Sequence, residues 1–245
     1  APAGVAFFVL MLPVLGFLLQ ESIEWNMPPN LTVGLPVVAC LFLFTIAVGI
    51  HSLINGAGPL ALAEGHMART LDAIIEAFRQ TEGLERQAQA FASARDDLVH
   101  ITARLVPALV VATTLVVAWA NLLTAMPILR LRQLPAPGFV RLNTWSPPER
   151  LVWVAIVGLA FLLMPGMGLR IVGANVVVVL FPVYFFAGMA VMSYYMEKKA
   201  VPKGLRTLVY MLVMVQQILL VVVVAVGFFD LWADFRKINR RAPAE

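Results

Sequence analysis

The sequence has few charged residues and a single cysteine. Charged residues make up 13% of the 245 positions, against about 25% in an ordinary soluble domain, and 61% of the residues are hydrophobic. Because Cys40 is the only cysteine, the sequence cannot form a disulfide framework or a CxxC redox motif. Its place inside an apolar run favours an inert buried thiol. Water is therefore not the main solvent of this chain.

Motifs of catalysis and nucleotide binding are also missing. His51, His66 and His100 lack the HExxH spacing of a zinc site, and the sequence has no GxSxG turn, Walker A loop or glycine-rich dinucleotide turn. The net charge of +4 comes from short basic clusters beside apolar runs, which is typical of membrane flanks. We expect no enzyme activity, no catalytic residues, no metal, no cofactor and no nucleic-acid partner.

Long uncharged stretches dominate what is present. They cover residues 25–63, 105–129, 151–169, 171–196 and 207–229. A helix of about 18 such residues or more crosses a hydrocarbon core about 30 Å thick, and the period-2 pattern of a membrane β-barrel does not occur. We predict an all-α, polytopic transmembrane helical bundle that forms a single integral membrane domain over 1–245. Its six or so spans are expected at about 4–21, 33–54, 102–129, 149–166, 171–195 and 205–235.

A polar segment at 64–100 lies between the second and third predicted spans. Its apolar residues recur at helical spacing and form one stripe, which consists of Met67, Leu71, Ile74, Ile75 and Phe78. Residues 64–97 carry seven acidic residues and four arginines, which disfavours a helix lying on anionic lipid. We predict an amphipathic helical segment whose stripe packs on the chain itself or on a partner protein.

The last predicted span ends in two aspartates and then basic residues. On a helix that continues to residue 235, Asp230 and Asp234 share a face with Lys237. A catalytic carboxylate pair is one reading, but Phe229 stands where the GxGD sequence of intramembrane proteases requires glycine. The favoured reading is a membrane-exit motif made of Asp230, Trp232, Asp234, Arg236 and Lys237.

Several side-chain amides lie inside the predicted spans. Such amides either bond to neighbouring helices, at about 0.6–2 kcal/mol each, or line a ligand cavity. The candidate ligand-binding residues are Asn121, Asn175, Gln216 and Gln217.

The distribution of positive charge leaves the membrane orientation open. With six spans, the lysines and arginines on alternate connections number eight on one side and ten on the other. The compact stretch "RKINRR" after the last span favours a cytoplasmic C-terminus.

Four segments between about 103 and 238 carry a family resemblance: "ARLVPALVVATTLVVAWANLLTA", "WSPPERLVWVAIVGLAFLL", "GLRIVGANVVVVLFPVYFFAGMAVMSYYMEKK" and "GFFDLWADFRK". They resemble the YybS-like family of bacterial membrane proteins, and the closing segment is the most specific. In size and six-helix build the chain is more distantly similar to the substrate-binding membrane components of energy-coupling-factor vitamin transporters. These resemblances imply a multi-pass protein of the bacterial inner membrane.

Two functions remain open at this point. One is the small-molecule-binding membrane component of a transporter, with the lipid bilayer, a small-molecule ligand and a coupling subunit as partners. The other is a non-transporting scaffold or assembly factor that recruits a partner through the 64–100 segment.

Overall fold

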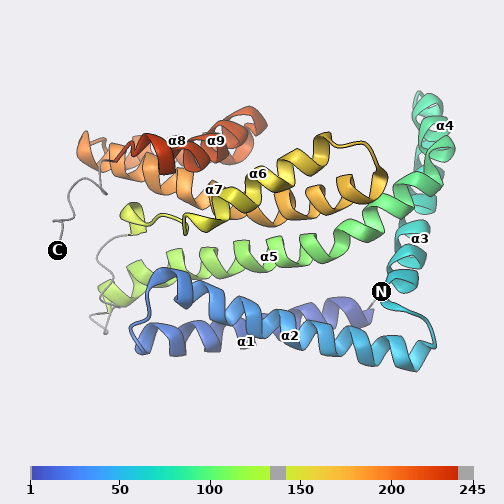
Figure 1. Cartoon of the computed structure of the whole chain (residues 1–245), viewed down its shortest axis with the longest axis horizontal. Coiled ribbons are helices and arrows are strands. Elements are labelled where there is room, and N and C mark those ends of the chain that lie inside the picture. Colours follow the sequence, from blue (N-terminus) through green and yellow to red (C-terminus); the bar gives the residue numbers. More distant parts are fainter. Residues whose placement is uncertain (1, 133–141, 237–245) are drawn as a thin grey trace.

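The computed structural model describes residues 2–132 and 142–236, and in these ranges every regular element is helical. The long helices lie side by side, while α3 and α4 stand across one end of the bundle (Figure 1). The predicted all-α class is confirmed. The elements are α1 (Pro2–Glu24), α2 (Pro29–Asn55), α3 (Pro59–Arg79), α4 (Glu85–Ser93), α5 (Arg95–Leu131), η1 (Leu142–Thr144, a 3-10 turn), α6 (Arg150–Leu163), α7 (Met167–Lys198), α8 (Lys203–Val215) and α9 (Gln217–Ala233).

Two buried clusters form the interior of the bundle. The first joins α1, α2 and α5, and its centre is Ala118 and Leu122, which are both fully buried. The second joins α6 and α7, with α9 packed against it through Phe228. The ring of Trp119 on α5 stacks on Phe186 of α7 at 5.3 Å, which connects the two clusters. Large apolar side chains elsewhere are exposed, as expected of helices whose outer faces meet lipid.

Glycines allow α7 to approach its neighbours closely. A Cβ atom at Gly188 would lie 1.9 Å from the carbonyl oxygen of Val223, and one at Gly227 would lie 2.1 Å from that of Tyr184. Nearer the start of α7, a Cβ at Gly173 would lie 2.6 Å from the carbonyl oxygen of Gly158 on α6. Small residues at such crossings let helix backbones pack together where lipid provides no hydrophobic driving force.

The six predicted spans correspond to three or four candidate membrane-crossing helices among the described residues. Helices α2, α5 and α7 are each long and apolar enough to cross, and α8 with α9 would be a fourth if the pair forms one span. The fourth predicted span is only the 14-residue helix α6. The sixth predicted span, over about 205–235, is not one continuous helix, because α8 and α9 meet at Gln216 with a bend of 103°, as in a broken span or a re-entrant loop.

The polar segment at 64–100 is divided among three helices. It contains most of α3 and all of α4, and its last residues already belong to α5, which begins at Arg95 and not near residue 102. Helix α5 continues through Pro107 and Pro127, so its charged first turns extend the membrane-crossing helix toward α3.

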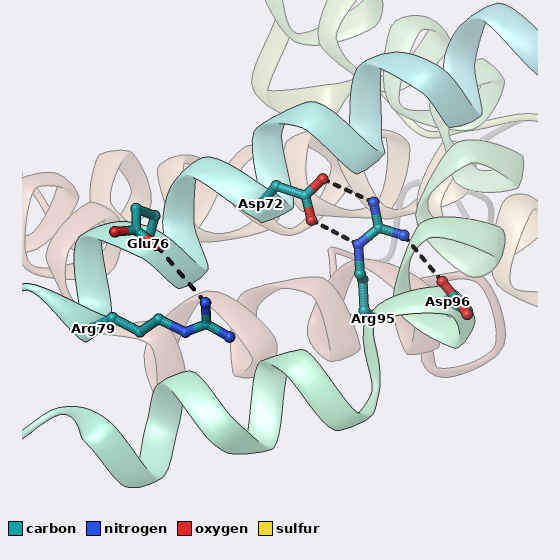
Figure 2. A network of polar contacts seen from close by, with 5 residues as sticks. All are labelled: Asp72, Glu76, Arg79, Arg95 and Asp96. Atoms are coloured by element: carbon teal, nitrogen blue, oxygen red, sulfur yellow. Dashed lines mark hydrogen bonds and ion pairs between the residues drawn. The ribbon is translucent and has the colours of Figure 1, made fainter.

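Ion pairs hold α3 against the first turns of α5. Arg95 donates to both carboxylate oxygens of Asp72, at 2.6 and 2.8 Å, and also to Asp96 at 3.1 Å (Figure 2). Farther along, Arg104 donates to Glu64 at 3.0 Å. The hydrogen bond from Arg95 lowers the pKa of Asp72 below its ordinary value of 3.8, so this carboxylate stays charged at neutral pH.

We predict that Gly188→Ala destabilises the bundle. The added methyl would collide with the backbone of α9, and such overpacking costs about 1–3 kcal/mol. Thermal unfolding in detergent would show a lower midpoint than in the wild type. Gly168→Ala is the matched control, because a Cβ there meets nothing within 4 Å in the same helix. Equal midpoints for the two variants would contradict the close crossing.

We also predict that Asp72→Asn loosens α3 and α4 from α5. The variant loses the bidentate pair with Arg95, whereas Glu76→Gln, the control, changes only exposed contacts within α3 and its cap, the 3.8 Å pair with Arg79 and the hydrogen bond from Gln80. Hydrogen exchange in α3 and α4 at pH 7 should be faster for Asp72→Asn than for the control.

The difference in hydrogen exchange between wild-type protein and Asp72→Asn should disappear as the pH is lowered. Because the folded-state pKa of Asp72 lies below 3.8, the pair contributes above that value and is lost as the pH falls through the lowered pKa. Wild-type protein at a pH well below 3.8 should therefore exchange like Asp72→Asn. An unchanged difference there would contradict the role of this carboxylate.

Candidate functional site

The chain turns sharply where α9 ends. The helix stops at Ala233, and Asp234 takes the left-handed conformation with φ 39° and ψ 54°. The prediction that Asp230 and Asp234 share one face of a helix running to residue 235 is therefore wrong. Aspartate tolerates this conformation better than most residues, which explains how the chain reverses here without glycine. Lys237 of the predicted exit motif lies outside the described residues.

The reversal brings Arg236 back onto Asp230. The Nη2 and Nε atoms of Arg236 donate to Oδ2 of Asp230 at 2.6 and 3.1 Å. Both side chains are buried, with 2% and 9% of their surfaces exposed. An ion pair this far from water is retained only where geometry and further hydrogen bonds compensate the lost solvation.

Further hydrogen bonds tie Arg236 to the segment that precedes α6. Its Nη1 atom donates to the backbone carbonyls of Asn143 and Trp145, each at 2.9 Å. The side chain of Asn143 in turn donates to Glu197 near the end of α7, and Trp145 donates to Asn30 in the first turn of α2. We call these residues the end network; its members are Asn30, Asn143, Trp145, Glu197, Asp230 and Arg236.

The end network joins four connections of the chain at one end of the bundle. Asn30 follows the α1–α2 turn, Trp145 precedes α6, and Glu197 precedes the α7–α8 turn. In addition, the hydroxyl of Tyr195 donates to the carbonyl of Phe235 just beyond α9. The ring of Trp145 packs on Trp119 at 4.4 Å, so the network rests directly on the first buried cluster.

A polar pocket of about 260 Å³ adjoins the end network. It is lined by Asn143, Thr144, Tyr194, Glu197 and Lys198. Two oxygens nearby, Oδ1 of Asn143 and Oδ1 of Asp230, are buried and have no hydrogen-bond partner within the described part of the chain. The pocket offers hydroxyl, amide, carboxylate and ammonium groups at the edge of the bundle.

A second cavity, of about 100 Å³, lies between α1, α2 and α5. The hydroxyls of Thr113 and Thr114 at this cavity donate to carbonyls of their own helix, so the threonines offer it no free donor. The cavity is therefore apolar in character. Its lining residues are Met11, Leu12, Leu15, Cys40, Leu41, Phe44, Val110, Thr113, Thr114 and Val117.

The four candidate amides do not line either of these two cavities. Asn121 is exposed on α5, and the amide of Asn175 donates to the carbonyl of Ile171 in its own helix at 2.8 Å. Gln216 forms the break between α8 and α9, and Gln217 is the first residue of α9; both are exposed. The glutamines thus mark an interruption of helical structure that the sequence prediction placed inside a span.

The apolar stripe of the polar segment is partly covered by the chain itself. Ile75 is 5% exposed, and the ring of Phe78 lies 5.6 Å from that of Phe91 on α4. Met67 and Leu71 are half-buried, while Ile74 keeps 40% of its surface exposed. Packing within the chain is one of the two alternatives that the sequence left open for this stripe.

The sequence pointed to Asp230 and Arg236 but not to the residues around them. Asn143 and Trp145 precede α6, whereas Glu197 lies in the last turn of α7, 54 residues after Asn143, and no spacing motif connects them. Trp232, another exit-motif residue, is 53% exposed and packs on Phe228 at 5.2 Å. No group of three or more metal-binding side chains occurs among the described residues.

The fold and the exposed apolar helices define an integral membrane protein of the helical class. The family model described as "Predicted membrane protein (DUF2232)" matches residues 1–231, so the chain belongs to that family. No curated protein and no solved structure matches the chain. The family match includes Asp230 and stops before Arg236.

We predict that Arg236→Met is strongly destabilising. It leaves Asp230 buried without a counter-charge, and breaking one partner of a buried pair costs about 3–5 kcal/mol. The double variant with Asp230→Leu should recover part of the loss, because no uncompensated charge remains. The measurement is thermal unfolding in detergent, with the exposed Lys199→Met as control. A midpoint for Arg236→Met close to that of the control would refute the prediction.

Proposed function

We propose that the protein is the small-molecule-binding membrane component of a transporter. The observation that carries the proposal is the break between α8 and α9 at Gln216, where the chain bends by 103°. Discontinuous helices of this kind often carry the solute site in transporters, because their ends expose backbone groups for binding.

The depth of the break is the first step of the argument. Gln217 is the first residue of α9, so it lies about 20 Å from Asp230 of the end network along a helix with a rise of 1.5 Å per residue. The hydrocarbon core of a bilayer is about 30 Å thick. The break is therefore placed deep in the apolar layer if α9 follows α7 across it.

The second step concerns the polar groups at the break. At the break itself, the amide N–H of Gln216 donates to the carbonyl of Leu212, and Leu220 donates to the carbonyl of Gln216. The neighbouring carbonyls of residues 213–215 and N–H groups of residues 217–219 have no place in the hydrogen-bond ladder of their own helix. Gln216 and Gln217 add two carboxamides that are exposed on the surface of this chain. Each unsatisfied polar group in hydrocarbon costs several kcal/mol, so contact of this surface with lipid chains is unfavourable.

A bound solute or a partner subunit would supply hydrogen-bond partners for these polar groups, and a transporter component binds both a solute and a partner subunit. Carboxamides donate and accept hydrogen bonds, which suits a neutral polar solute such as a vitamin or a nucleobase. The apolar side chains around the break are equally exposed, with Met214, Val215 and Ile218 at 67%, 79% and 76%. They would pack against a coupling subunit in the assembled transporter.

Solute binding tests the proposal directly. Purified protein in nanodiscs should show an increase in melting temperature with at least one member of a vitamin and nucleobase panel. The variant that combines Gln216→Leu with Gln217→Leu should lose this increase, and Gln89→Leu on α4, also an exposed glutamine, should keep it. Absence of any shift across the panel, or a shift that survives the double variant, would count against the proposal.

A further inference from the structure

The segment from residue 199 to residue 236 begins and ends at the same end of the bundle. At its start, Glu197 accepts a hydrogen bond from Asn143, and at its end Arg236 donates to the carbonyl of the same Asn143. Tyr195 and Phe235 are joined by a second hydrogen bond. Asn143 therefore contacts both the end of α7 and the residues just beyond α9.

A segment that returns to the end from which it left does not cross the membrane. Helix α7 crosses it, and α8 then leads away from the end network until the bend at Gln216 turns the chain back along α9. Residues 199–236 would cross only if their two ends lay on opposite sides, and the shared contacts with Asn143 exclude that arrangement.

The distribution of positive charge then indicates which side this is. Counted along the sequence alone, four lysines and arginines fall in each of the segments 130–150, 198–206 and 236–241, which contain or directly follow end-network residues in the chain. The remaining six of the 18 are five between residues 69 and 104 and Arg170. The side of the end network thus has twelve lysines and arginines against six on the other side, whereas the six-span prediction gave ten against eight. Positive residues concentrate on the cytoplasmic side of inner-membrane proteins.

We infer that α8 and α9 form a re-entrant pair with both ends at the cytoplasmic face, and that α3 and α4 lie on the opposite face. Figure 1 shows α3 and α4 across the end of the bundle away from the end of α9. Their segment carries seven acidic residues between positions 64 and 97, a composition that the positive-inside rule permits outside the cytoplasm.

The inference separates two interaction surfaces of this protein. A cytoplasmic partner would meet the end network, the polar pocket and the lysines at 198, 199 and 203. A partner that binds α3 or α4 would have to be extracytoplasmic. The inference does not rest on the proposed function, since it uses only the connections of the chain and its charges.

Single-cysteine labelling tests both parts of the inference. Cysteines would be introduced singly as Ser93→Cys on α4, Ser146→Cys before α6 and Lys199→Cys after α7, all exposed positions, or appended after Glu245. Intact cells expressing each full-length variant are treated with a membrane-impermeant maleimide before and after permeabilisation. The unmodified protein is the control, because Cys40 is 4% exposed within α2. If Cys40 does react, the series is repeated with Cys40→Ser.

The expected result is labelling of position 93 in intact cells, and of positions 146, 199 and the appended cysteine only after permeabilisation. Labelling of the appended cysteine together with position 93 in intact cells would show that residues 199–236 cross the membrane and would overturn the re-entrant pair. Labelling of positions 146 and 199 in intact cells would overturn the orientation. Reporter enzymes fused after Glu245 and active on only one side of the membrane provide a second readout that needs no cysteine.

Discussion

The buried guanidinium of Arg236 determines how the C-terminal part of this protein is arranged. One side chain neutralises Asp230 and also binds two backbone carbonyls from the segment before α6. A charge this deeply buried is expensive unless every donor has an acceptor, so the geometry around it is strongly constrained. The turn after α9, the start of α6 and the end of α7 are fixed together through this one group and Asn143.

The same requirement for satisfied polar groups applies at the other end of α9. There the helix begins at a break where Gln216 and Gln217 are exposed on this chain. In water such a break would need no explanation, but in hydrocarbon it needs a solute, a water path or another subunit. At the end network Arg236 donates to Asp230 and to two backbone carbonyls, whereas the carboxamides of Gln216 and Gln217 are exposed on this chain. The proposed ligand or partner would supply hydrogen-bond partners for these carboxamides.

Packing of the bundle follows a different principle from that of a soluble core. Lipid is as apolar as the side chains, so close backbone contact replaces hydrophobic burial as the source of affinity between helices. Gly188 and Gly227 at the α7–α9 crossing, and Gly158 and Gly173 at the α6–α7 crossing, provide this contact. Helix α7 is therefore the element around which α6 and α9 are arranged, and it carries Tyr195 and Glu197 to the end network.

The sequence by itself determined the solvent, the helical class and the approximate positions of most helices, because runs of apolar residues longer than 18 have few alternatives. It also singled out the polar segment at 64–100 and the residues Asp230 and Arg236. It did not show the break at Gln216, which neither proline nor glycine marks, nor the reversal at Asp234, whose conformation depends on Arg236 finding its partners.

Only the tertiary structure decided that residues 199 and 236 lie at the same end, since this depends on contacts between segments 93 and 54 residues apart. Hydropathy along the sequence indicates where an apolar helix forms. It does not indicate at which end of the bundle a later segment of the chain lies, because that depends on contacts between distant residues.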